Sequence, residues 1–276
     1  MMCNRSFGPL GPLSWAIVVA CLMPLFAAAA EPTSNARPLP DWPYLEPGLG
    51  QLMDAVTLHV SFDAGTAVPD MAAGDDDYAP QLLGGRNNNA GPQFAPGLVG
   101  QAMVLGSGGA VYPQRGNVTL ENRGALALWI KPLDWQRPND GNTVFAMTTN
   151  ATFYLQRQGP LRGDDGKVVR HEGVQYLART SGGRLANLVA GSEWENGRWY
   201  LLVANWSWPS FALSVNAEPF QSKSLSAAPT GEDFGNLRIG DGGPPRGLID
   251  EVLAFRRPLE IDEVKLLYRL GERSRD

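Results

Sequence analysis

The sequence predicts an all-β protein in which two antiparallel sheets stack as a sandwich, with a short helix at the C-terminus. Three observations lead to this fold class. From residue 54 to about residue 257 the side chains alternate with the period of two that is typical of strands. Turn signals rich in glycine, asparagine and aspartate separate these segments at short intervals. Only one segment, near the C-terminus, has the spacing of an amphipathic helix.

The predicted strands follow one another through this whole region. In residues 56–62 apolar side chains alternate with polar ones, and in residues 211–215 they alternate with small or polar ones. In residues 125–130 Leu126, Leu128 and Ile130 alternate with Ala125, Ala127 and Trp129, and residues 200–206 are apolar on both faces, which predicts a central strand. Shorter strands are predicted at residues 102–105, 143–147, 152–156, 174–178, 237–239 and 248–255.

Turns and the helix complete the predicted domain. Turns are predicted where Gly combines with Ser, Asn or Asp, at residues 106–109, 164–166, 181–183, 196–197 and 241–245. The helix is predicted over residues 258–268, where Leu259, Val264, Leu267 and Tyr268 form an apolar stripe. Glu260 lies at its start, a position where Ser or Thr would cap the helix more strongly.

The N-terminus has the pattern of a secretory signal. Arg5 and the terminal amine precede an apolar run at residues 15–26, and four alanines follow before Glu31. We therefore predict a signal peptide at residues 1–30 and export to the periplasm or the extracellular space. Two alternatives stay open: acylation of Cys21, because residues 18–21 resemble a bacterial lipobox, and retention of the segment as an uncleaved N-terminal anchor.

Residues 31–52 are rich in proline and show no periodicity, which predicts an extended arm rather than a helix or an inner strand. The arm carries four apolar residues that are costly to leave in water: Leu39, Trp42, Tyr44 and Leu45. The arm either folds back on its own domain or binds a partner protein through these residues. The sandwich domain is predicted over residues 53–276.

The composition excludes several classes of protein. Cys3 and Cys21 both lie in the predicted signal peptide, so the mature chain would have no disulfide, no cysteine-bound metal and no catalytic thiol. With only His59 and His171, a site built from several histidines is not expected. The net charge is −5 at pH 7 and the basic residues are scattered, which argues against nucleic acid as a partner.

Several motifs occur in a fixed order along the chain. They are Val60-Ser61-Phe62-Asp63, Gly97-Leu98-Val99-Gly100-Gln101-Ala102, Leu126-Ala127-Leu128-Trp129-Ile130-Lys131-Pro132, Gly197-Arg198-Trp199-Tyr200, Leu237-Arg238-Ile239-Gly240 and Gly247-Leu248-Ile249-Asp250-Glu251-Val252. Together they resemble the concanavalin A-like, laminin-G-like (LamG-like) jelly-roll family of secreted bacterial proteins, over about residues 58–271. One hairpin departs from the family pattern, because Asn216-Ala217 stands where the family usually has Asp-Gly.

The resemblance implies a two-sheet jelly roll but no single function, because the family includes sugar-binding modules, adhesion domains and a few glycan-cleaving relatives. It also implies a candidate calcium site, since the family often combines its early acidic turn with the late Ile-Asp-Glu segment. The corresponding residues are Asp70, Asp75, Asp77 and Asp250. In the alternative interpretation, residues 75–77 form a solvated loop and Asp250 accepts backbone amides at a strand crossing.

The acidic residues do not form a convincing catalytic pair. Glycosidases need two carboxylates that flank the scissile bond. Glu193 and Glu195 share a face but lack a third acid, while Asp250 and Glu251 are adjacent and so point to opposite faces of a strand. We therefore predict no catalytic residues and a protein that is not an enzyme. A glycan hydrolase or lyase with atypical residues is the remaining alternative.

Three tryptophans are candidates for a sugar platform, because exposed aromatic rings stack on sugar faces. Trp135, Trp194 and Trp208 lie in predicted loops. In the alternative interpretation these loops fold over the edge of the sandwich and the rings pack on the core. Three other tryptophans lie in predicted strands and are expected in the core: Trp129, Trp199 and Trp206.

Two functions from different classes follow from these patterns. The first is an exported, non-catalytic binding module that recognises carbohydrate or an envelope polymer. The second is an accessory or structural subunit of a periplasmic or membrane-associated protein complex, docked through the N-terminal arm. Calcium is the only cofactor that the sequence suggests.

Overall fold

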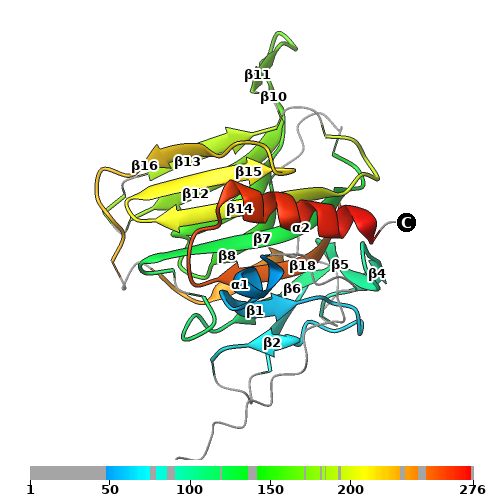
Figure 1. The fold of residues 1–276 in the computed structure, drawn as a ribbon. Helices are drawn as coiled ribbons and strands as arrows, with labels where there is room; N and C mark the ends of the chain where they lie inside the picture. The colour runs from blue at the N-terminus through cyan, green and yellow to red at the C-terminus, as the bar shows by residue number, and fades with distance from the viewer. Residues whose placement is uncertain are drawn as a thin grey trace, which may run out of the picture. The chain divides into compact units, whose positions relative to one another are not determined.

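Two antiparallel sheets stack face to face and enclose the main apolar core (Figure 1). Sheet A has nine strands: β1 (Val56–Val60), β2 (Met71–Ala72), β4 (Phe94–Pro96), β5 (Gln101–Leu105), β7 (Arg123–Pro132), β14 (Tyr200–Ser207), β15 (Ser210–Val215), β16 (Gln221–Ser224) and β18 (Gly247–Phe255). Sheet B has seven: β3 (Gln81–Gly84), β6 (Gly108–Tyr112), β8 (Thr143–Thr148), β9 (Phe153–Gln158), β12 (Gly173–Arg179), β13 (Leu185–Ala190) and β17 (Leu237–Asp241). The strands β10 (Leu161–Arg162) and β11 (Val168–Arg170) form a separate hairpin, and the helices are α1 (Leu49–Met53) and α2 (Ile261–Arg273).

The computed structural model describes residues 48–74, 79–85, 91–118, 120–135, 142–170, 172–180, 182–183, 185–191, 194–230, 234–241 and 247–274. The predicted signal peptide (1–30) and the predicted contact residues of the arm lie outside the described residues, as do Asp75, Asp77, His171 and Glu193. Of the helices that the structure describes, none combines the length and the apolar character that crossing a membrane requires.

The chain order of the strands produces the jelly roll. Sheet A runs in the order β16-β15-β14-β7-β18-β1-β2, with β5 also paired to β18 and β4 to β5, while sheet B runs in the order β13-β12-β9-β8-β17-β6-β3. Neighbouring strands in each sheet pair antiparallel. The predicted fold class, a concanavalin A-like sandwich with a short C-terminal helix, is therefore confirmed.

A second apolar core lies on the outer face of sheet A, where both helices pack. The rings of Trp129 on β7 and Tyr268 on α2 stack with their centroids 5.7 Å apart. A Cβ atom on Gly271 would lie 2.2 Å from the Trp129 ring, so glycine is what lets α2 approach the sheet this closely. This second core explains why β14 is apolar on both faces, with Leu201 and Val203 under the helices and Leu202 facing the other sheet.

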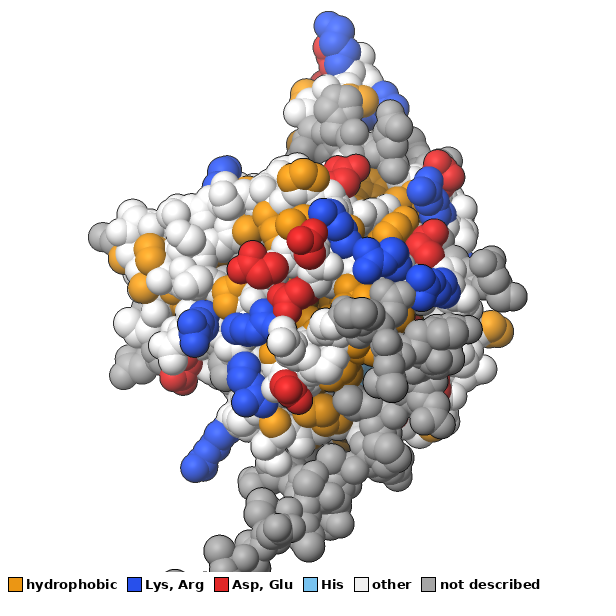
Figure 2. Space-filling view, viewed as in Figure 1, with side chains coloured by type: hydrophobic (Ala, Val, Ile, Leu, Met, Phe, Trp, Pro, Cys, Tyr) orange, Lys and Arg blue, Asp and Glu red, His pale blue; other side chains and the backbone are white. Residues whose placement is uncertain are grey.

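The side that bears α2 has no field of a single charge. Figure 2 shows basic and acidic side chains interspersed over this side. Two of the pairs are Arg257 with Glu263, at 2.6 Å, and Lys265 with Asp262, at 2.8 Å. A mixed pattern of this kind does not attract a polyanion.

Two predicted boundaries are wrong. Residues 49–52 were expected in an extended arm, yet Leu49–Met53 forms α1, and Leu49 and Leu52 are buried on sheet A. Gly48, with φ of 91°, turns the chain into this helix. The C-terminal helix begins at Ile261 and continues to Arg273, five residues beyond the predicted end, because Leu270 extends the apolar stripe that packs on the sheet.

The predicted turn at residues 106–109 is half correct. Gly106, with φ of 91°, forms the turn, but Gly108 and Gly109 belong to β6. A Cβ atom on Gly109 would lie 2.5 Å from the carbonyl oxygen of Ile239 on β17, so this glycine allows close contact between strands.

The hairpin between β15 and β16 keeps its tight turn without glycine. Asn216 and Ala217 both have positive φ, 51° and 61°, and Asn216 Oδ1 accepts the backbone N–H of Leu201 at 3.0 Å. Asparagine tolerates this left-handed conformation, whereas alanine pays for its Cβ atom.

We expect Ala217→Gly to stabilise the protein by about 0.5–1 kcal/mol, because glycine removes the steric cost at positive φ. Urea unfolding followed by circular dichroism measures the change. Ala212→Gly, inside strand β15, is the matched control and should destabilise the protein. An equal loss of stability in both variants would contradict the strain at Ala217.

Candidate functional site

A buried carboxyl on the central strand β18 ties together two of the sequence motifs. Asp250 is fully buried, and its Oδ2 accepts the backbone N–H groups of Leu98, at 2.7 Å, and Val99, at 3.4 Å. Its Oδ1 accepts the N–H of Glu251 at 3.0 Å. A Cβ atom on Gly97 would lie 2.5 Å from Oδ2, so glycine at this position lets the loop close around the carboxyl.

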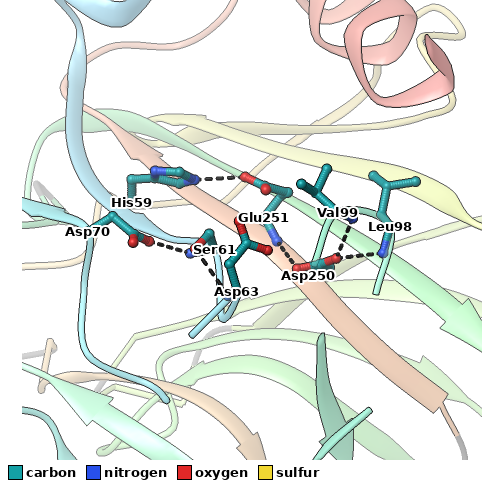
Figure 3. Close-up of polar contacts among 8 residues, drawn as sticks. All are labelled: His59, Ser61, Asp63, Asp70, Leu98, Val99, Asp250 and Glu251. Atoms are coloured by element: carbon teal, nitrogen blue, oxygen red, sulfur yellow. Dashed lines mark hydrogen bonds and ion pairs between the residues drawn. The ribbon is translucent and has the colours of Figure 1, made fainter. Parts of the chain in front are cut away.

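The residues beside Asp250 form a second buried pair. Glu251 has φ of 49° at an irregularity in the pairing of β18 with β7, and its Oε2 lies 2.7 Å from Nε2 of His59 on β1 (Figure 3). Both side chains are buried. His59 is therefore a cross-strand neighbour, as its position in the strand predicts. Asp63 lies close by, and its burial together with the charges of Glu251 and Asp70 raises the pKa of its carboxyl.

The described members of the predicted calcium set, Asp70 and Asp250, both accept backbone N–H groups. Asp70 Oδ2 accepts the N–H of Ser61 at 2.7 Å, and three N–H groups surround the carboxyl of Asp250. Amide hydrogens repel a cation. Among the described residues, no group of three or more His, Cys, Asp or Glu side chains is arranged to hold a metal ion. The alternative interpretation of Asp250, an acceptor for backbone amides, is the one that the structure confirms.

Trp135 is not a sugar platform. Its side chain is fully buried, and its ring stacks on Phe145 and packs against Trp194. The guanidinium of Arg157, itself fully buried, lies over the same ring at 5.4 Å and donates to the carbonyl oxygen of Trp135. The loop folds over the end of the sandwich because this cluster excludes water.

The other two candidates have different surroundings. Trp208 is half-buried, stacks on Phe234 and donates its indole N–H to the carbonyl of Leu120 at 2.6 Å. Trp194 is 5 % exposed and packs against Tyr200, so its ring faces are not open for stacking. It does line a cleft at the edge of the sandwich. The prediction of an exposed three-tryptophan platform is therefore wrong, because two of the three rings are buried.

The outer face of sheet B offers a different surface. Both helices of the described residues pack on sheet A, while the strands of sheet B turn polar, aromatic and aliphatic side chains away from the main core. The cross-strand register places these in two transverse rows. The first row consists of Gln81, Val111, Arg238, Met147, Tyr154, Leu177 and Asn187. The second consists of Val144, Gln156, Gln175 and Val189.

An amide pair lies at the centre of this face. Gln156 Nε2 donates to Gln175 Oε1 at 2.6 Å, and each residue is 8 % exposed. This hydrogen bond uses one amino hydrogen and one carbonyl, so one carbonyl and one amino group of the pair are not engaged by it. Both residues are in register on β9 and β12, and Tyr154 lies two residues from Gln156 on the same face. We call Tyr154, Gln156, Gln175, Asn187 and Arg238 the sheet B face. Its fixed amides and its phenol suit a ligand with many hydroxyl groups.

Sequence reasoning missed this face, although the signal was present. Tyr154 and Gln156 alternate with Phe153 and Leu155, which belong to the main core. The same alternation around Gln175 indicates a polar face. The alternation did not show that both helices of the described residues would pack on sheet A and leave the outer face of sheet B without a helix.

A family model described as the concanavalin A-like lectin/glucanases superfamily matches residues 105–265. The chain belongs to this superfamily. The match runs from β6 to β18 and the first turn of α2, and so includes strands of both sheets and every residue of the sheet B face. No curated protein matches the chain.

Solved structures show the same fold. Domain 4 of AbnA, an extracellular arabinanase from Geobacillus stearothermophilus solved with arabinotriose, is 21 % identical, with a TM-score of 0.53; the match covers 78 % of this chain and 99 % of that one. The binding domain of botulinum neurotoxin serotype D is 13 % identical, with a TM-score of 0.58 and coverage of 78 % and 52 %. The binding domain of Paraclostridial Mosquitocidal Protein 1 is 12 % identical, with a TM-score of 0.57 and coverage of 79 % and 52 %. The chain spans about half the length of the two toxin domains.

Proposed function

We propose that this protein is an exported, non-catalytic module that binds a carbohydrate or an envelope polymer on the sheet B face. The observation that carries the proposal is the hydrogen-bonded pair Gln156–Gln175 with Tyr154 on the outer face of sheet B, while the helices occupy sheet A. The superfamily includes lectins, and one similar structure is a domain of an arabinanase in complex with arabinotriose. Export rests on the signal pattern of residues 1–30.

The described acids support a binding role rather than catalysis. Both Asp250 and Glu251 are buried: Asp250 accepts backbone N–H groups, and Glu251 is paired with His59. Glu172 is paired with Arg157 at 2.6 Å. Screening the protein for activity on polysaccharides tests the alternative, a glycan hydrolase or lyase.

Affinity electrophoresis in gels that contain soluble polysaccharides tests the proposal. We expect the wild type to be retarded by at least one polymer, and the double variant Gln156→Ala/Gln175→Ala to lose about tenfold in affinity, because two amides that meet sugar hydroxyls are gone. Because the double variant removes both side chains of the hydrogen bond between the two amides, neither amide is left without its partner, and the fold should be retained.

Lys265→Ala, exposed on α2 and remote from sheet B, is the control and should be retarded like the wild type. Migration of the wild type that no polymer changes would refute the proposal. Retardation that the double variant keeps in full would place the binding surface elsewhere.

The second candidate function is an accessory subunit of an envelope complex. The observation that favours it is the hairpin β10–β11, which exposes Leu161, Val168 and Val169, the last with 63 % of its surface accessible. Exposed apolar groups of this kind mark protein contacts.

The arm is the second proposed contact, and its deletion should end at residue 47, because α1 is part of the domain. Loss of a co-purifying envelope protein on deletion would support this function; isolation without a partner in either case would refute it.

A further inference from the structure

A cleft of about 350 Å³ lies where the edges of the two sheets meet. The end of β13 and Gly191 form one side, while β15, β16 and the turn before β16 form the other. We call this site the edge cleft. Its volume is in the lower part of the range of roughly 300–1,000 Å³ that is typical of small-molecule pockets. The edge cleft therefore fits a small ligand rather than a folded partner.

The floor of the edge cleft is apolar and rigid. It is formed by Trp194, Tyr200 and Leu213, among others. The rings of Trp194 and Tyr200 have their centroids 4.6 Å apart, and Trp135 packs against Trp194 from the buried side. Side chains fixed in this way lose little freedom when a ligand binds.

One polar atom of the floor has no partner. The indole nitrogen of Trp194 is buried and donates to no acceptor in the described part of the chain. Gly191, with φ of 72°, lies beside it, and a Cβ atom there would be 3.2 Å from this nitrogen and 2.5 Å from Cζ2 of the ring. Buried donors without an acceptor are rare and need an explanation. A ligand oxygen within hydrogen-bonding distance of this nitrogen would supply the acceptor.

The rim carries polar groups of both signs. Arg198, Glu218 and Gln221 are exposed and line the edge cleft. The guanidinium of Arg198 lies 5.5 Å from the centroid of the Tyr200 ring and 3.5 Å from Glu195 Oε1. The rim has one cation, Arg198, and one anion, Glu218, so it suits a neutral ligand with several donors and acceptors.

We propose that the edge cleft binds a terminal sugar unit of a neutral glycan. The sugar fills the edge cleft beside its apolar lining, its hydroxyl groups meet Arg198, Glu218 and Gln221, and one oxygen accepts the Trp194 indole N–H. This site shares no residue with the sheet B face. It rests on the proposed function for the class of ligand only.

Nuclear magnetic resonance on the mature, ¹⁵N-labelled protein tests the site through the indole N–H signals. Trp194→Phe assigns the Trp194 signal by its disappearance. We expect arabinotriose, maltose, cellobiose or lactose, at up to about 20 mM, to move this signal, while the signal of Trp208, already bonded to Leu120, stays in place. Saturation of the shift gives the affinity.

Two variants separate binding from folding. Gln221→Ala changes an exposed rim residue and should lower the affinity about fivefold, the effect of one lost hydrogen bond. Ser222→Ala, the next residue on the same edge strand but with its side chain on the other face, should leave the affinity unchanged.

The outcomes distinguish this site from the proposed function. If none of the four sugars moves the Trp194 signal, the edge cleft is not a sugar site, whatever the electrophoresis shows for the sheet B face. If a sugar moves the signal and Gln221→Ala has no effect, the rim does not bind it and the proposal is overturned. If the signal moves with the expected variant effects while no polymer retards the protein, the edge cleft stands and the sheet B face fails.

Discussion

Replacing Asp250 by alanine should lower the free energy of unfolding by about 3–5 kcal/mol, because three buried N–H groups lose their acceptor at once. The loop that begins at Gly97 closes around this carboxyl, so its contacts to β18 would loosen too. Urea unfolding measures the change. Asp262→Ala, which removes an exposed acid on α2, is the control and should change stability by less than about 0.5 kcal/mol.

The pH dependence of stability reports the ionisation of the same group. Burial, with a smaller contribution from the charge of Glu251, raises the pKa of Asp250 to about 9, although the three N–H groups act in the opposite direction. An acid with a raised pKa in the folded state stabilises the fold most below its unfolded pKa, and this stabilisation is lost as the pH rises towards 9. The advantage of the wild type over Asp250→Asn should therefore shrink between pH 5 and pH 9. An advantage that grows with pH would show that the folded protein holds Asp250 ionised.

Replacing Arg157 by alanine should also cost about 3–5 kcal/mol, because it leaves a buried cavity and a carboxylate without its partner. Arg157 is fully buried, bonds Glu172 at 2.6 Å and covers the Trp135 ring. Burial already raises the pKa of Glu172, and the guanidinium opposes this rise. The loss of stability in Arg157→Ala should therefore be smaller at acidic pH, where Glu172 is protonated.

A double-mutant cycle separates the ion pair from the packing. Arg157→Met keeps most of the volume, and combining it with Glu172→Gln removes the isolated charge. We expect the double variant to be more stable than Arg157→Met alone. If Glu172→Gln gives no recovery in the Arg157→Met background, the cost lies in lost packing on Trp135 and not in the unpaired charge.

Sequence patterns were a good guide to the strands and a poor guide to the site. The period of two around Leu58, Leu128 and Leu202 placed β1, β7 and β14, because alternation depends on the strand geometry alone. The tryptophans of the loops were misjudged, because a loop residue is exposed or buried according to where the loop folds. For Trp135, the partner that decides its burial is Arg157, which is distant in sequence and was not recognised.

The candidate binding surfaces needed the tertiary structure for the same reason. Gln156 and Gln175 form one surface only because β9 and β12 pair in a register that sets them opposite each other. The edge cleft brings together Trp194, from the loop after β13, and Gln221, from β16 at the edge of sheet A. Neither combination follows from spacing along the chain.

The sequence by itself determined the sandwich and the C-terminal helix, since local periodicity carries this information. Only the tertiary structure decided which sheet face stays open, which tryptophans are buried and where a ligand fits. The physical reason is that exposure and cavity shape depend on contacts between residues far apart in the chain, and a single sequence does not encode these contacts in any local pattern.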